Sequence, residues 1–129
     1  MFKKGTVSIF PETISRKIET VPFLEKKVFC TQLKGKQRFL RLFGESTKPY
    51  GLASGFVTLK SKESVGLHNT QNKEEVLIIL QGQAQVSYGK HSRIKVKKGF
   101  FVYIPPKTDH DLKNIGKTIL KYVYITACI

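Results

Sequence analysis

Short apolar segments recur along the chain from Gln37 onward, and most are closed by glycine, proline or small polar residues. Within many of them apolar and polar residues alternate, as in a strand with one buried face. Helix-period segments of 10–15 residues between the strands are missing, which disfavours a parallel α/β sheet. The pattern predicts about eight or nine strands, over residues 37–43, 52–60, 65–70, 76–81, 84–88, 93–97, 100–104, 111–114 and 117–129.

The close spacing of these strands is typical of a sandwich or barrel, so we predict a compact antiparallel β-barrel over residues 37–129. Residues 1–36 are the least regular part of the chain, and we expect an N-terminal extension that packs on the barrel or on a partner subunit. The apolar run at 76–80 predicts a strand buried on both faces. Gly55, inside the second strand, marks a bulge or a close approach of two chain segments.

The length and composition indicate one globular domain with a core of its own, since the chain has 129 residues and is 40% hydrophobic and 25% charged. No apolar run approaches the roughly 18 residues that span a bilayer. The first residues turn polar without the apolar stretch of a signal peptide. We therefore expect a cytoplasmic protein with no membrane segment. Cys30 and Cys128 lie too far apart to suggest a disulfide framework.

The chain is strongly basic, with 23 Lys and Arg against 9 Asp and Glu and a net charge of +14. Nucleic acid or another polyanion is the first partner that this charge suggests. Few of the basic residues are arginines, however, although arginine is the better group for bidentate phosphate contacts. In the densest cluster, at 93–97, basic residues alternate with Ile94 and Val96, which is typical of the solvated face of a strand. A solvated basic surface is the favoured interpretation, and nucleic acid remains the alternative.

Three side chains form a candidate metal site. His68 and Glu75 flank a short turn between consecutive strands, so their side chains can converge inside a barrel. His110 follows two prolines, which end regular pairing and bend the chain. Two imidazoles and a carboxylate suit divalent Fe, Mn, Ni or Zn, and three protein ligands leave positions open for chemistry. From the residues alone, hydrogen-bonded histidines and a solvated Glu74–Glu75 turn are an equally good interpretation.

The two segments around these residues resemble the two motifs of the cupin superfamily, Gly-x5-His-x-His-x3,4-Glu-x6-Gly and Gly-x5-Pro-x-Gly-x2-His-x3-Asn. The resemblance extends from about residue 53 to the end of the chain, and it implies an all-β, cupin-like double-stranded β-helix (jelly-roll) barrel. It also implies a small-molecule ligand and a homodimer. The motif positions met at matching spacing are His68, Glu75, Gly82, Gly99, Pro105, His110 and Asn114.

Three motif positions differ from the family pattern. Lys62 stands at the opening glycine of the first motif and Lys107 at the middle glycine of the second, while Thr70 replaces the second histidine. In metal-binding cupins that histidine is a ligand, and a threonine hydroxyl is a poor ligand for a transition metal. Either the remaining three residues hold a metal, with Thr70 or Gln71 contacting the ligands or the substrate, or the pocket binds a small ligand without metal.

The function that the resemblance implies is that of a small metal-dependent enzyme acting on a small polar or anionic metabolite such as a sugar or sugar acid. His68, Glu75 and His110 would hold Fe, Mn, Ni or Zn, and Tyr103 or Lys107 would assist at the mouth of the barrel. The alternative is a cupin that binds a small ligand without catalysis. A barrel of this type hosts many reactions, so the fold alone does not select one.

Overall fold

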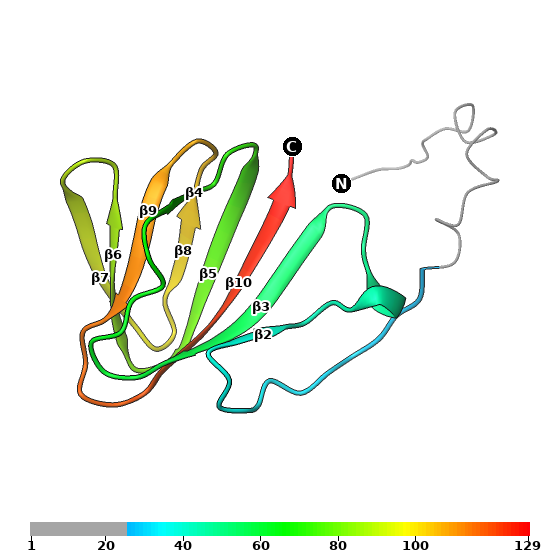
Figure 1. Cartoon of the computed structure of the whole chain (residues 1–129), viewed down its shortest axis with the longest axis horizontal. Helices are drawn as coiled ribbons and strands as arrows, with labels where there is room; N and C mark the ends of the chain where they lie inside the picture. The colour runs from blue at the N-terminus through cyan, green and yellow to red at the C-terminus, as the bar shows by residue number, and fades with distance from the viewer. Residues whose placement is uncertain (1–25) are drawn as a thin grey trace.

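The computed structural model describes residues 26–129, which form two antiparallel β-sheets (Figure 1). The five-stranded sheet has the order β2-β3-β10-β5-β8 and the four-stranded sheet the order β4-β9-β6-β7. The predicted all-β fold is therefore confirmed. Of the extension predicted at 1–36, residues 1–25 lie outside the described part and 26–36 contain no strand. The division of the chain at residue 37 stays a prediction.

Strand bounds agree with the sequence pattern to within a few residues. The strand predicted at 65–70 is only two residues long in the structure. The strand predicted at 111–114 begins two residues earlier than the sequence pattern indicated. The five-stranded sheet is built from β2 (Phe39–Arg41), β3 (Leu52–Leu59), β10 (Leu120–Cys128), β5 (Lys73–Gln81) and β8 (Phe101–Ile104). The four-stranded sheet is built from β4 (His68–Asn69), β9 (Asp109–Asn114), β6 (Gln83–Tyr88) and β7 (Ser92–Lys97). A 3₁₀ turn, η2 (Glu45–Thr47), connects β2 and β3.

Successive side chains of a strand point to opposite faces of its sheet. The side chains that face the other sheet form the hydrophobic core, which therefore lies between the two sheets. Val57 and Leu77 from the larger sheet belong to the same buried cluster as Val86 and Leu112 from the smaller one. The prediction that residues 76–80 are buried on both faces is wrong. Burial alternates along β5, and Leu80 on the outer face is 36% exposed. The part of the outer face formed by Val76, Ile78 and Phe101 is nevertheless apolar.

Two glycines allow close approaches between neighbouring chain segments. A Cβ at Gly55 would lie 2.4 Å from the ring of Tyr124 on the neighbouring strand, which confirms the close approach expected at this position. Gly82, the closing glycine of the first motif, has a φ of +88° in the turn from β5 to β6. A Cβ there would lie 2.7 Å from the backbone oxygen of Ile119, so glycine is required for both reasons.

The barrel has two distinct ends (Figure 1). Since β5 and β10 are antiparallel, the start of β5 and the C-terminal end of β10 lie at one end, together with β4 and the start of β9. The turns that follow β3, β5, β7 and β9 lie at the opposite end. No helix within residues 26–129 is long and apolar enough to cross a membrane.

Candidate metal centre

Antiparallel pairing brings the two candidate histidines together. β4 pairs with β9 in a register that places His68 directly opposite His110. Both side chains point to the interior, because His110 shares the inner face of β9 with Leu112 and Asn114. Glu75 lies on the inner face of β5, two residues before Leu77. The inward direction of His110 thus follows from strand alternation, and the two prolines provide only the preceding turn.

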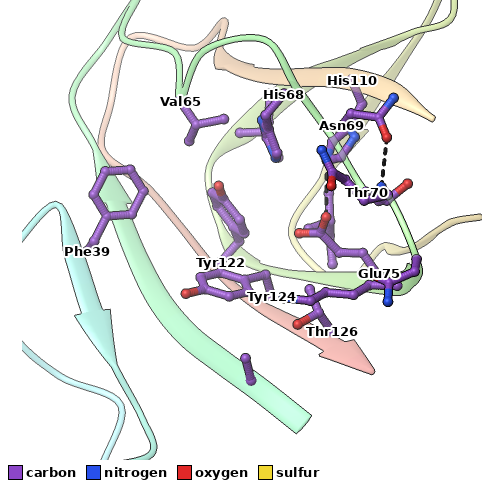
Figure 2. Close-up of a pocket in the computed structure, with 16 residues that line it drawn as sticks. Phe39, Val65, His68, Asn69, Thr70, Glu75, His110, Tyr122, Tyr124 and Thr126 are labelled. Atoms are coloured by element: carbon purple, nitrogen blue, oxygen red, sulfur yellow. Dashed lines mark hydrogen bonds and ion pairs between the residues drawn. The ribbon is translucent and has the colours of Figure 1, made fainter. Parts of the chain in front are cut away.

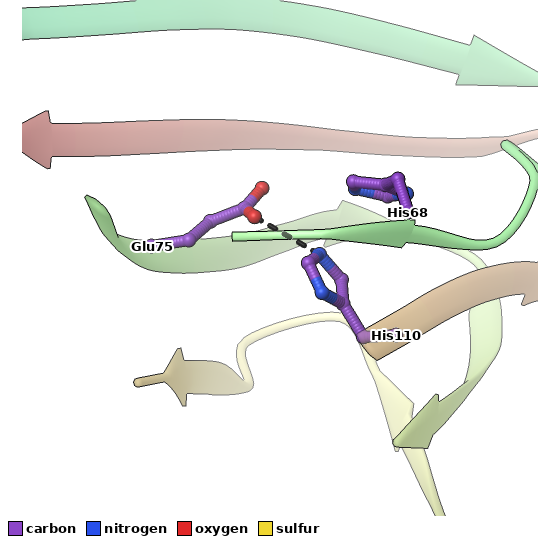
Figure 3. Close-up of side chains that lie close together, drawn as sticks. All are labelled: His68, Glu75 and His110. Atoms are coloured by element: carbon purple, nitrogen blue, oxygen red, sulfur yellow. Dashed lines mark hydrogen bonds and ion pairs between the residues drawn. The ribbon is translucent and has the colours of Figure 1, made fainter. Parts of the chain in front are cut away.

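The three side chains converge on one point (Figure 3). Their potential ligand atoms all lie within 4.8 Å of one another, close to the roughly 4.2 Å between opposite ligands of one ion with bonds of about 2.1 Å. The imidazole rings of His68 and His110 are 4.0 Å apart between centroids. Glu75 and His110 are buried while His68 is exposed, so the triad sits at the boundary between the core and the barrel mouth.

Backbone carbonyls orient both imidazoles for metal binding. Nδ1 of His68 lies 2.8 Å from the Gly66 oxygen, and Nδ1 of His110 lies 3.0 Å from the Thr108 oxygen. A carbonyl oxygen only accepts hydrogen bonds, so each Nδ1 carries a proton. This arrangement leaves each Nε2 as the nitrogen that can bind a metal, which is the usual way in which surrounding groups orient a ligating histidine. The donor set therefore fits a divalent transition metal.

Without a metal, His110 pairs with Glu75. Its Nε2 lies 3.0 Å from Oε1 of Glu75, so both ring nitrogens face acceptor oxygens. Burial lowers the pKa of His110, but the hydrogen bonds to Glu75 and to the Thr108 carbonyl outweigh burial and raise it above the ordinary value. A metal bound to Nε2 would therefore replace a proton on this nitrogen.

Thr70, at the position of the missing second histidine, holds the turn between β8 and β9. Its hydroxyl donates to the Pro105 oxygen at 2.7 Å and accepts from the Thr108 nitrogen at 3.0 Å. The side chain is buried, with 6% of its surface exposed. Since the turn that it holds leads into His110, Thr70 supports the site through the backbone.

The remaining predicted site residues divide into two groups. Gln71 lines the cavity beside Thr70, whereas Tyr103 and Lys107 do not contribute to the cavity wall. Tyr103 lies on the outer face of β8, half-exposed, and its hydroxyl donates to Glu74 at 2.6 Å. This hydrogen bond raises the pKa of Tyr103. Lys107 is exposed, and its backbone nitrogen donates to the Gln71 oxygen.

A cavity of about 710 Å³ opens next to the triad (Figure 2). Its mouth is polar, with Asn69, Gln71, Asn72 and Lys73 around the turn between β4 and β5. Its inner wall is mostly apolar and aromatic, and comprises Phe39, Val65, Leu77, Leu112, Tyr122 and Tyr124. The cavity therefore has room for a small molecule, with polar groups at the mouth and the histidines to one side.

The sequence pattern did not single out the aromatic wall of this cavity. Tyr122, Tyr124 and Thr126 alternate along β10 and face inward, and Thr126 lies opposite Glu75 in the sheet. Their two-residue spacing was a usable signal in the sequence. Which face of β10 points inward, however, depends on its register with β3 and β5, and this register is a property of the folded sheet.

A comparison with family models identifies this architecture. Residues 55–126, which include the triad and the cavity walls of β5, β9 and β10, match the model described as "Cupin domain". This chain belongs to the cupin family. The match begins inside β3 and ends inside β10, so it spans strands of both sheets.

One relative is similar in sequence to part of this chain. An uncharacterised protein of Methanocaldococcus jannaschii is 40% identical over 70 residues, which are 54% of each chain. The aligned region thus spans about half the length of this relative.

Solved structures share the cupin fold. An RmlC-like cupin family protein of M. jannaschii with a double-stranded β-helix fold has a TM-score of 0.64 and 21% identity, over 80% of this chain and 91% of that one. A predicted oxalate decarboxylase of Thermotoga maritima has a TM-score of 0.56 and 17% identity, over 70% and 92% of the two chains. At such identities the likeness shows the fold alone.

Proposed function

We propose that this cupin is a metal-dependent enzyme acting on a small polar or anionic metabolite such as a sugar or sugar acid. The observation that carries the proposal is the convergence of His68, Glu75 and His110, whose potential ligand atoms, one from each residue, lie within 4.8 Å of one another. Both imidazoles are held for metal binding by backbone carbonyls on their Nδ1 side. The metal is Fe, Mn, Ni or Zn, each of which accepts imidazole and carboxylate ligands.

The cavity supports a substrate with polar groups at one end. A bound metal with open positions would polarise a substrate carbonyl or hydroxyl. Asn69, Gln71 and Asn72 offer amide groups at the mouth for further hydroxyl or carboxylate oxygens, and Lys73 adds a positive charge. The apolar wall excludes water from the opposite side, which strengthens electrostatic contacts in the site.

Metal content and metal-dependent stability test the proposal. Purified protein should contain near-stoichiometric metal by elemental analysis. After treatment with chelator, added Mn²⁺, Fe²⁺, Ni²⁺ or Zn²⁺ at about 100 times Kd should stabilise it by about 2.7 kcal/mol, seen as a higher melting temperature. Glu75→Gln and His110→Gln should lose most of this increase. The matched control is His91→Gln, in the exposed turn between β6 and β7, and it should retain the increase.

A wild-type protein without metal and without a metal-dependent melting shift would contradict the proposal and favour the alternative, a cupin that binds a small ligand without catalysis. The engagement of Thr70 with the β8–β9 turn in place of a fourth ligand supports this alternative. A melting screen with sugars and organic acids in the presence of chelator separates the two. A hit retained under chelator indicates a metal-independent binding protein.

We also propose that the chain forms a homodimer through the outer face of the larger sheet. Two cross-strand rows on this face contain no charged side chain. The rows are Phe56–Val123–Ile78–Phe101 and Ser54–Ile125–Val76–Tyr103. Exposure increases toward the edge strand β8, where Phe101 is 66% and Tyr103 52% exposed. An apolar surface of this kind is typical of protein interfaces.

A further inference from the structure

The end of the barrel opposite the metal centre is formed by four turns that are tied together by hydrogen bonds. The Ser61 hydroxyl donates to the Gly116 oxygen at 2.6 Å, which joins the turn after β3 to the turn after β9. The Lys98 nitrogen donates to the Gly82 oxygen at 3.1 Å, which joins the turns after β5 and β7. The Ile115 nitrogen donates to the Gln83 oxygen and connects the two pairs of turns. These turns lie together at one end of the barrel (Figure 1), which we call the closed end.

The closed end carries a concentration of exposed positive charge, because five lysines lie in these turns or at the end of the adjoining strand β7. They are Lys60, Lys62, Lys97, Lys98 and Lys117, and all are exposed.

Acidic residues of the described chain are nearly absent from the closed end. Glu63 alone lies in these turns, and its carboxylate pairs with Arg38 at 3.9 Å. The acidic residues of β5 and β9 lie toward the metal centre instead, at positions 74, 75, 109 and 111. The charge of the molecule is therefore unevenly distributed along the barrel.

Two hollows cross this surface on either side of the turn after β5. One, of about 560 Å³, is lined by Lys97, Lys98 and Lys117 together with Gly82 and the loop at 115–118. The other, of about 600 Å³, is lined by Lys36, Arg38, Lys60 and Lys121, together with Glu63, Ile119 and two polar side chains. Positively charged walls around a concave surface concentrate the field that attracts an anion. The mutual repulsion of these lysines would also be relieved by a bound polyanion.

An exposed aromatic ring lies within the same surface. Phe100 follows Lys98 by two residues in the turn between β7 and β8, and it is 44% exposed. Its backbone nitrogen donates to the Lys97 oxygen, so the residue belongs to the same turn as Lys97 and Lys98, which line the first hollow. A charged groove beside an exposed aromatic ring is the combination with which proteins bind unpaired nucleic acid, since phosphates occupy the groove and a base stacks on the ring.

From these features we infer that the closed end binds single-stranded nucleic acid without sequence preference. A duplex would contact the lysines but offers no unstacked base to Phe100. An anionic membrane is broad and flat, and it would touch the rims of the two hollows without entering them. Lysine, which outnumbers arginine here, serves this role because it neutralises phosphates as a point charge and needs no bidentate geometry.

Fluorescence anisotropy with the full chain tests the inference. The probes are a labelled oligothymidine of about 16 nucleotides, a duplex of the same length and vesicles containing phosphatidylserine. The single strand should bind most tightly, with an affinity that falls as salt is raised. Lys97→Gln/Lys98→Gln/Lys117→Gln should weaken binding at least tenfold and reduce the slope of log affinity against log salt by about 2, since each single-strand phosphate contact contributes about 0.7. Added chelator should have no effect, because the metal centre lies at the other end.

Two controls distinguish the loss of a specific binding site from a general loss of positive charge and from misfolding of the variant. Lys27→Gln/Lys48→Gln/Lys90→Gln removes the same charge from positions outside the closed end and should leave affinity within about threefold. Phe100→Leu should weaken single-strand binding about tenfold and leave duplex binding unchanged, with the melting temperature of each variant recorded. Tighter binding to duplex or vesicles than to the single strand would overturn the inference. So would equal losses in the two triple variants, or no single-strand binding at about 50 mM salt.

Discussion

Thr70 occupies the position of a metal-ligating histidine, yet its hydroxyl already serves the turn that leads into His110. The two hydrogen bonds, to the Pro105 oxygen and from the Thr108 nitrogen, hold together two segments that are distant in sequence. The same turn presents the Thr108 oxygen to Nδ1 of His110. At this motif position the chain thus has a residue that supports the turn before the candidate ligand His110.

Restoring the histidine should trade stability for metal affinity. We expect Thr70→His to bind Mn²⁺ or Ni²⁺ about tenfold more tightly, or about 1.4 kcal/mol, and to lower the stability of the metal-free protein by about 1–2 kcal/mol because two buried hydrogen bonds are lost. Titration calorimetry and urea unfolding measure the two effects. Thr70→Val is the matched control, and it should lose stability without gaining affinity. Unchanged affinity in Thr70→His would show that residue 70 does not face the metal.

The pair of His110 and Glu75 predicts a pH dependence for the metal-free protein. Since the folded pKa of His110 is raised, the pair contributes its full stability below the unfolded pKa of about 6.5. This contribution is lost as the pH rises through the folded pKa. The stability difference between wild type and Glu75→Gln, measured by urea unfolding under chelator, should therefore shrink as the pH is raised above about 6.5. A stability difference that does not change with pH would contradict a charged His110–Glu75 pair in the folded, metal-free protein.

The elements of the fold depend on turns that require left-handed backbone. Gly82 and Gly89 have φ angles of +88° and +64° in the turns after β5 and β6. Lys62 and Lys107 stand where the cupin motifs have glycine, and their φ angles are +71° and +55°. Both lysines thus adopt the left-handed backbone conformation that glycine adopts most readily.

Two alanine substitutions separate backbone strain from steric collision at these turns. We expect Gly89→Ala to cost about 1–2 kcal/mol for the left-handed conformation, since nothing lies within 4 Å of its added Cβ. Gly82→Ala should cost about 1–3 kcal/mol more, because its Cβ would meet the backbone of Ile119. Chemical denaturation of both variants provides the comparison. Equal losses would mean that the β9–β10 loop yields freely to the added methyl group.

Asn114, the last residue of the second motif, connects secondary-structure elements and lies outside the candidate metal centre. It is fully buried, and its amide nitrogen donates to the oxygens of Leu59 and Thr118. Its side-chain oxygen accepts from the Gly116 nitrogen. These three bonds join the end of β3 to the loop that follows β9. The motif therefore contributes both a residue of the candidate metal centre at one end, His110, and a residue that packs the turns at the other, Asn114.

The molecule as a whole presents two contrasting surfaces besides the cavity. The outer face of the larger sheet is apolar toward β8, while the closed end is basic. We expect the apolar face to make the wild-type protein a dimer in sedimentation velocity experiments. Phe101→Glu should weaken dimerisation at least tenfold, because a buried unpaired carboxylate is costly.

The control for dimerisation is Leu67→Glu. Leu67 is 73% exposed and lies just before β4, outside the two apolar rows. The variant should sediment like the wild type. A wild-type protein that sediments as a monomer would contradict the proposed interface, and so would equal dissociation in both variants.

The sequence by itself determined the fold class, the family and the three candidate ligands. Alternation along each strand and the spacing of His68, Glu75 and His110 are local properties, so they can be read without the tertiary structure. Tertiary structure decided which face of each strand points inward and which distant segments meet. The pairing of β4 with β9 sets His68 against His110, and Tyr103 faces outward because of its place on β8. The gathering of lysines from four turns likewise depends on how the strands are ordered in the two sheets, and spacing along the chain does not specify that order.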